Sequence, residues 1–86
     1  AYIAEYGQAR DAMHHAMMID YSGDPDVDFV RGMIPHHQGG VEMAALQMKY
    51  GTDPILNRLA WNIFVSQPQE IMVMERWLEE RGENRE

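Results

Sequence analysis

Apolar side chains recur every three or four residues through most of the chain, a spacing typical of amphipathic helices. We expect a first helix from about Ala4 to Ile19, a second from about Pro25 to Tyr50 and a third from about Pro54 to Arg81. The apolar face of the first helix is formed by Tyr2, Tyr6, Ala9, Met13 and Met17. The apolar stripe of the third helix is formed by Ile55, Leu59, Ile63, Ile71, Met74 and Leu78. No segment alternates apolar and polar residues over the length of a strand, so the sequence predicts an all-α fold.

Two breaks separate these helices, and both end in Asp-Pro: Ser22-Gly23-Asp24-Pro25 and Gly51-Thr52-Asp53-Pro54. In each break the aspartate is suited to cap the free amides of the first turn, and the proline is preset for the first helical position. Gly51 and Gly82 follow the second and third helices, where glycine is able to take the left-handed capping conformation.

The two longer helices are joined by a turn of three residues, so they should pack as an antiparallel hairpin. The second helix should be about 39 Å long, at a rise of roughly 1.5 Å per residue. A hairpin with one shorter helix leaves an apolar flank uncovered. We therefore expect a single domain, residues 1–86, that forms a homodimer and thereby completes a four-helix-type bundle.

Charge and composition exclude several classes of partner. The formal net charge is -7 and the chain has seven basic residues, whereas a nucleic acid is held by clusters of Lys and Arg. No apolar run approaches the roughly 20 residues of a membrane span, so we expect no membrane insertion. The absence of cysteine excludes disulfides and cysteine-based metal sites. A bound metal or a partner subunit is then the usual support for so small a domain.

Methionine is unusually frequent, with eight among 86 residues, and all four histidines lie close to methionines. On a helix, residues three or four apart share a face, with Cβ atoms roughly 5–6 Å apart. The pairs that meet this condition are Met13 with Met17, His14 with Met17 or Met18, and Met33 with His36 or His37. Met43 follows His36 by two turns. Thioether sulfur is a soft ligand and imidazole a borderline one, so together they select copper, with Cu(I) favoured and Cu(II) left open.

Adjacent histidines are turned about 100° apart on a helix, so His36 and His37 cannot both point the same way. Either one of each pair is a ligand or the two serve separate sites; we favour His36, His37 and His14 over His15. Pro35 stands directly before the second pair, and a proline inside a helix costs roughly 3 kcal/mol. Because Gly39-Gly40 follows, a kink there would let the backbone approach a neighbour. Local rules broken at one place often mark a functional site.

Each feature also has a plainer explanation. A methionine stripe alone is more often core packing, and Met72 and Met74 are expected in the core. A single His-His pair is more often a solvated helix face, but two such pairs with methionine at helical spacing favour a metal site. The sequence contains no Gly-x-Ser-x-Gly, His-Glu-x-x-His or Glu-x-x-His arrangement. We therefore expect that the protein is not an enzyme.

The run Asp28-Phe29-Val30-Arg31-Gly32-Met33-Ile34-Pro35-His36-His37-Gln38-Gly39 strongly resembles the family called domain of unknown function 305. The same pattern is matched by Met13-His14-His15-Ala16-Met17, Val41-Glu42-Met43-Ala44, Ser66-Gln67, Gln69-Glu70-Ile71 and Met74-Glu75-Arg76-Trp77-Leu78. The resemblance implies a ferritin-like helical fold, export to the periplasm or secretion, and a link to copper. The family's ligand motifs fall on Met13, His14, Met17, Met33, His36, His37 and Met43.

Two positions depart from the family pattern. Gly40 stands where alanine is usual, which would widen the space beside His36. Pro68 interrupts the Gln-x-x-Glu stretch and puts a regular third helix in doubt there. The leading hypothesis is a copper-binding protein for sequestration, storage or resistance. The alternative is a homodimeric helical interaction module without metal, in which the methionines are core, and a third hypothesis is an oxidoreductase with a Cu or Fe centre.

Overall fold

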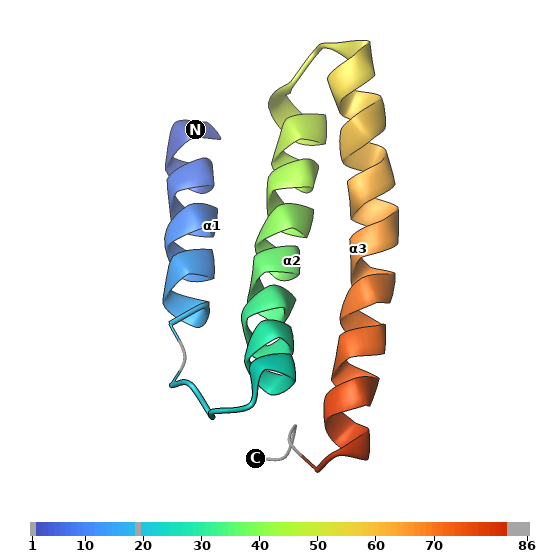
Figure 1. The fold of residues 1–86 in the computed structure, drawn as a ribbon. Helices are drawn as coiled ribbons and strands as arrows, with labels where there is room; N and C mark the ends of the chain where they lie inside the picture. The colour runs from blue at the N-terminus through green and yellow to red at the C-terminus, as the bar shows by residue number, and fades with distance from the viewer. Residues whose placement is uncertain (1, 19, 83–86) are drawn as a thin grey trace.

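The computed structural model describes residues 2–18 and 20–82, which form three helices and, within those ranges, no strand. They are α1 (Tyr2–Ala16), α2 (Pro25–Tyr50) and α3 (Pro54–Glu80) (Figure 1). The all-α fold and the three-helix order are confirmed, and the bounds of α2 are as predicted. The first helix ends at Ala16, earlier than expected, and the predicted end at Ile19 lies outside the described residues.

The three helices lie side by side, with α2 in the middle (Figure 1). Helix α2 packs against both neighbours, whereas α1 and α3 do not contact each other within the described residues. Helices α2 and α3 form the expected antiparallel hairpin. None of the described helices combines the length and the apolar character that would be needed to cross a bilayer.

The predicted N-caps are confirmed, while one predicted C-cap is wrong. The carboxylate of Asp24 accepts a hydrogen bond from the amide of Asp26 at 3.0 Å, and that of Asp53 accepts from Ile55 at 2.9 Å. Gly82 has the left-handed φ of 72°. Gly51 is extended instead, with φ -80° and ψ 153°, because the chain runs straight into the cap of α3. The carbonyl of Gly51 accepts a hydrogen bond from the side chain of Asn57 at 3.2 Å, which ties the turn to α3.

Both interior prolines are accommodated without breaking a helix. Helix α2 continues through Pro35, whose side chain is buried, and α3 continues through Pro68. The doubt about a regular third helix was therefore wrong. A proline removes one hydrogen bond, and the packing of a long helix against its neighbour is able to offset that local cost.

Helix α1 is held to α2 at two levels. Near its end, Met13 lies directly against Gly39: a methyl group placed on that glycine would be 2.5 Å from the sulfur of Met13. Near its start, Glu5 accepts hydrogen bonds from the hydroxyl of Tyr50 and from Lys49. These two contacts, that of Tyr50 above all, hold the pKa of the Glu5 carboxyl below its ordinary value.

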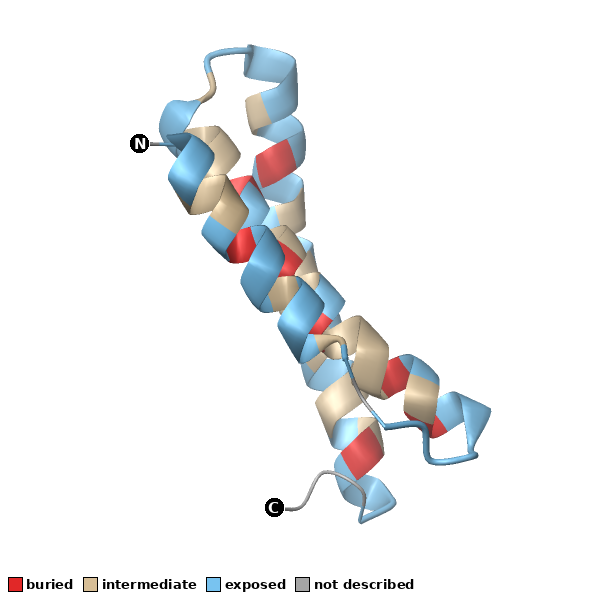
Figure 2. Cartoon of the chain, turned by 90° about the vertical axis from the view of Figure 1, so that its left-hand side faces the viewer, coloured by how far each residue is buried: buried red, intermediate tan, exposed pale blue. Residues whose placement is uncertain are grey.

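Buried positions are few along the described helices (Figure 2). The buried hydrophobic residues are mainly small ones, alanine and valine. A cluster of buried residues joins Val27 and Val30 of α2 to Leu78 of α3, with Ile34, Met74 and Trp77 packed around it. The expectation for Met74 is therefore confirmed. Met72 is 65% exposed, so the expectation that it lies in the core was wrong. Many large apolar side chains remain in contact with solvent, which leaves a chain of this size with limited hydrophobic stabilisation.

The contact between Met13 and Gly39 generates a stability prediction. A Gly39→Ala substitution places a methyl group into the methionine side chain, and overpacking of this kind costs about 1–3 kcal/mol. Gly32→Ala is the matched control on the same helix, because nothing lies within 4 Å of the added methyl group there. Gly32→Ala should stabilise the protein by about 0.5–1 kcal/mol through helix propensity. Gly39→Ala should therefore unfold at a lower urea concentration than Gly32→Ala. Equal unfolding midpoints for the two variants would contradict the close approach of Met13 to Gly39.

Candidate metal centre

One face of α2 carries most of the side chains that the sequence marks as metal ligands on this helix. Residues at alternating intervals of three and four lie on one side of a helix. The stripe with this spacing, which we call the open face, consists of Phe29, Met33, His36, Gly40, Met43 and Gln47. None of the six is charged, Phe29 is 62% exposed and Met43 is 40% exposed. The open face therefore places the half-buried Met33 and the exposed His36 on the same side of α2.

Two apolar hollows flank this stripe at its ends. The first, here called the Gly40 groove, has a volume of about 310 Å³ and lies between Gly40 and Met43 of α2, Leu59 and Ile63 of α3, and Tyr6 of α1. It shows that both neighbouring helices border the open face at its C-terminal half.

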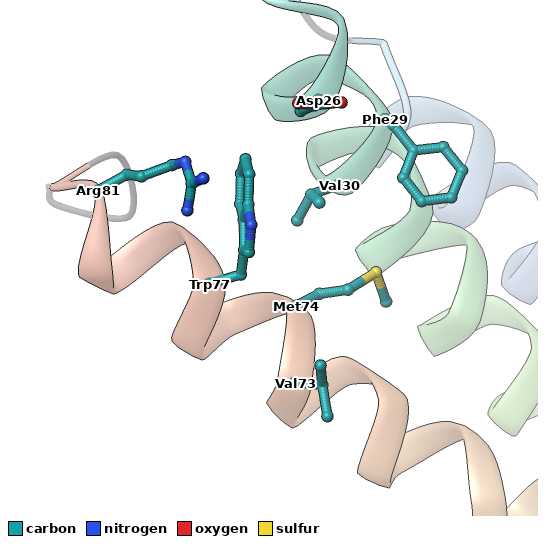
Figure 3. A pocket seen from close by; sticks show the side chains of 7 residues that line it. All are labelled: Asp26, Phe29, Val30, Val73, Met74, Trp77 and Arg81. Carbon is teal, nitrogen blue, oxygen red and sulfur yellow. The ribbon is translucent and has the colours of Figure 1, made fainter.

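The second hollow, here called the Phe29 groove, has a volume of about 420 Å³ and lies at the other end of the stripe. Its walls include Phe29 and Val30 of α2 and Met74 and Trp77 of α3, and the guanidinium of Arg81 lies 3.7 Å from the centre of a Trp77 ring (Figure 3). Met33 and His36 lie on the helix between the two grooves.

The predicted ligands of α1 are less closely gathered. Met13 is half-buried against Gly39, one turn after His36, so its sulfur lies at the level of the open face. His14 is exposed, and Met17 is half-buried in the turn that follows the helix. Met18 is 80% exposed. Helix α1 thus places one thioether against α2 and leaves the imidazole of His14 in solvent.

His37 points to a different neighbour from His36. Its Nε2 lies 2.6 Å from Oε1 of Glu70 on α3, and its side chain is 15% exposed. The two histidine rings are 6.3 Å apart between centroids. With Nε2 on the carboxylate, Nδ1 is buried and has no hydrogen-bond partner among the described residues. A carboxylate on one ring nitrogen, with the other nitrogen free, is the usual arrangement of a histidine that binds a metal.

Sequence reasoning did not identify Glu70 as a neighbour of His37, and it left the role of Gln67 open. The side-chain oxygen of Gln67 is buried without a partner among the described residues, and it lies 2.5 Å from where a methyl group on Gly40 would be. Both pairs, His37 with Glu70 and Gly40 with Gln67, are equidistant along the chain from the Asp53–Pro54 junction. The short turn between α2 and α3 determines which residues of the two helices face each other, so it is the sequence feature from which both pairs could have been predicted.

The seven predicted residues therefore do not form one cluster in a single chain. No group of three or more His, Asp or Glu side chains in the described part of the chain is placed to hold a metal ion. Met43 is ten residues from Met33 on the same helix, about 15 Å away at roughly 1.5 Å per residue. An ion bound at Met33 and His36 needs further ligands from α1, from thioethers or from another molecule.

Fold and side chains together define a small all-helical protein with methionine and histidine on an exposed helix face. The family model named Domain of unknown function (DUF305) matches residues 26–86, and the chain belongs to that family. The match covers α2 and α3 and leaves out the segment that carries Met13, His14 and Met17. A similar protein is the "Uncharacterized protein L153" of Acanthamoeba polyphaga mimivirus, which is 38% identical over 56 residues, or 65% of this chain. The aligned part spans 37% of that relative's length.

The contact with Glu70 predicts which nitrogen of His37 carries the proton. In the neutral ring, Nε2 should be protonated and Nδ1 should not, because the carboxylate accepts a hydrogen bond from Nε2. Long-range proton–nitrogen NMR spectra distinguish the two tautomers at a pH where the ring is neutral. Glu70→Ala should remove this preference, while the spectrum of exposed His15 serves as the internal control. A proton on Nδ1 of His37 in the unmodified chain would be inconsistent with the contact.

Proposed function

We propose that the protein binds copper through methionine and histidine side chains and functions in copper sequestration, copper storage or resistance to copper. Cu(I) is the favoured oxidation state, and Cu(II) is the alternative. The observation that carries the proposal is the open face of α2, on which half-buried Met33 and exposed His36 lie one turn apart. A soft thioether next to an imidazole selects copper over harder cations such as Mg²⁺ or Ca²⁺.

Two further features support this proposal. The sulfur of Met13 lies against Gly39, so a second thioether is present within one turn of His36 along α2. His37 has one ring nitrogen on Glu70 and the other without a partner among the described residues, which is the arrangement of a tuned metal ligand. His14, Met17 and Met43 complete the proposed set. The set has no enzymatic role in this proposal.

We place the protein in the periplasm or outside the cell as part of the same proposal. Thioethers do not pair as disulfides in an oxidising compartment, whereas thiols do. A chain without cysteine that relies on methionine is suited to handling copper there.

A second candidate function is a homodimeric helical interaction module without metal. It is favoured by the two apolar grooves and by the exposure of Phe29 and Met43 on the open face. In this alternative the methionines of α2 are contact residues between two chains. Methionine suits both roles, since its flexible thioether fills irregular apolar gaps as well as binding soft metals.

The copper proposal predicts metal-dependent stability. Chelator-stripped protein should melt several degrees higher with Cu(I) at about 100 times its dissociation constant, since such a ligand adds roughly 2.7 kcal/mol to stability. Zn(II) should have a smaller effect, because it does not favour thioethers. The measurement is a thermal melt followed by circular dichroism, with Cu(I), Cu(II) and Zn(II) added separately.

The matched variants distinguish a site from general metal effects. His36→Ala and Met33→Leu should lose most of the Cu(I) shift. The controls His15→Ala and Met72→Leu carry the same changes at exposed positions outside the proposed set and should keep it. An absence of any shift in the unmodified protein would reject copper binding and favour the metal-free interaction module.

A further inference from the structure

We infer that the open face of α2 is the contact surface for a second copy of this chain, packed antiparallel, and that the two copies share copper ligands. The occupant is a second copy because the face is complementary to itself when one helix is reversed. The interface follows from the distribution of charge and side-chain size on α2, and the shared ligation rests in addition on the proposed function.

The open face is free of charge in a chain that is otherwise strongly acidic. The six positions Phe29, Met33, His36, Gly40, Met43 and Gln47 include no Asp, Glu, Lys or Arg, while 24% of the chain is charged. With a formal charge of -7, two copies repel each other over most of their surfaces. The centres of protein interfaces are depleted of charged side chains and enriched in aromatic residues and methionine, as this stripe is.

The register of the contact follows from the length of the helix. Helix α2 runs from residue 25 to residue 50, so two antiparallel copies overlap fully when they cross next to Gln38. Met33 and Met43 lie five residues before and after Gln38, and His36 and Gly40 lie two residues before and after it. In this register Met33 therefore faces Met43 of the second copy, and His36 faces its Gly40.

This register also places exposed side chains against the grooves of the second copy. His36 is exposed and faces Gly40 of the second copy, which is covered by the side-chain amide of Gln67. Phe29, 62% exposed, lies beyond Met33 and is directed to the end of the Gly40 groove of the second copy. Because the contact is two-fold symmetric, each copy inserts a large residue and offers a groove to the other.

Charge favours the antiparallel arrangement over the parallel one. The start of helix α2 is acidic, with Asp24 at the N-cap and Asp26 and Asp28 in the first turn. Its last turn carries the basic residue Lys49. A parallel pair places the two acidic ends side by side, whereas an antiparallel pair places each acidic end beside the last turn of the other copy. The helix dipoles have the same preference.

This arrangement completes a ligand set that one chain leaves incomplete. At the rise of roughly 1.5 Å per residue, Met43 is about 15 Å from Met33 and about 10 Å from His36 along their own helix, but Met43 of the second copy is adjacent to both. Each of two symmetric sites then holds copper with Met33 and His36 from one copy and Met43 from the other. Two thioethers and an imidazole form a donor set that Cu(I) accepts.

Cross-linking of metal-free protein tests the interface and its register. The chain has no cysteine, so Met33→Cys and Met43→Cys variants each carry one thiol. After mixing and treatment with a short bis-maleimide under chelator, the equimolar mixture should give a covalent dimer that joins position 33 to position 43. Each variant alone should give little, since equal positions are about 15 Å apart along the axis in this register.

The controls separate the possible outcomes. Adding Phe29→Glu to both variants should abolish the cross-link, while Met72→Glu, a similarly exposed position on α3, should not. Strong cross-linking of Met33→Cys with itself would show a parallel contact and overturn the register. A monomer in sedimentation equilibrium, or disruption by Met72→Glu alone, would overturn the assignment of the open face.

Complementation tests the shared ligation separately. A Met33→Leu/His36→Ala variant and a Met43→Leu variant should each bind little Cu(I), as measured by competition with a chromophoric Cu(I) chelator. After the two are mixed and allowed to exchange subunits, half of the dimers are mixed and each of these has one intact site. The mixture should therefore recover about a quarter of the capacity of the unmodified protein.

The cross-linking and complementation experiments test the interface and the shared copper ligation separately. Cross-linking without complementation would keep the interface and reject copper ligation between copies. Full binding by the Met43→Leu variant alone would show that each chain holds the ion without its partner. No Cu(I) binding by the unmodified protein would reject the proposed function while leaving the cross-linking result to decide the interface.

Discussion

Two consecutive glycines in the middle of α2 determine how the three helices come together. Gly39 admits the side chain of Met13 from α1, and Gly40 admits the amide of Gln67 from α3. Because successive residues are turned about 100° apart, the two glycines open two different sides of one helix at the same level. Alanine at either position would meet a neighbouring side chain at 2.5 Å. Gly40 itself belongs to the open face, so α3 borders this face at Gly40, and Met33 and His36 lie on the same stripe toward the start of α2.

The fold could be predicted from the sequence because its signals are local. Asp-Pro caps, the three-residue turn and the spacing of apolar residues depend on neighbours along the chain, and they placed α2 at its observed bounds. The end of α1 was harder, since Met17 and Met18 continue the helical pattern after the helix has ended. Gly51 was expected to be left-handed, but its conformation is set by the cap of the next helix and by Asn57, six residues away.

The candidate site could be predicted in its residue types and less well in its arrangement. Helical spacing correctly grouped Met33 with His36, which depends on one helix alone. The partner of His37 depends on the register between two helices, and so Glu70 was not identified. The seven predicted metal ligands lie in three places: at the end of α1, on the side of α2 that faces α3, and on the open face. This division depends on where α1 and α3 pack against α2. That information is tertiary. The separation of about 15 Å between Met33 and Met43, by contrast, follows from the rise of roughly 1.5 Å per residue in one helix.

In the proposed arrangement of the open face, copper binding and dimerisation would be thermodynamically linked. The small core leaves Phe29 and Met43 exposed in a single chain, so their burial by a second copy would contribute stability that the monomer lacks. If an ion is held by Met33 and His36 of one copy and Met43 of the other, it binds the dimer and not the monomer. Mass action then requires that copper strengthens the dimer and that dimerisation raises the affinity for copper by the same factor. A protein with this linkage would bind copper more weakly when dilute and more tightly as its own concentration rises, which suits sequestration by an abundant protein.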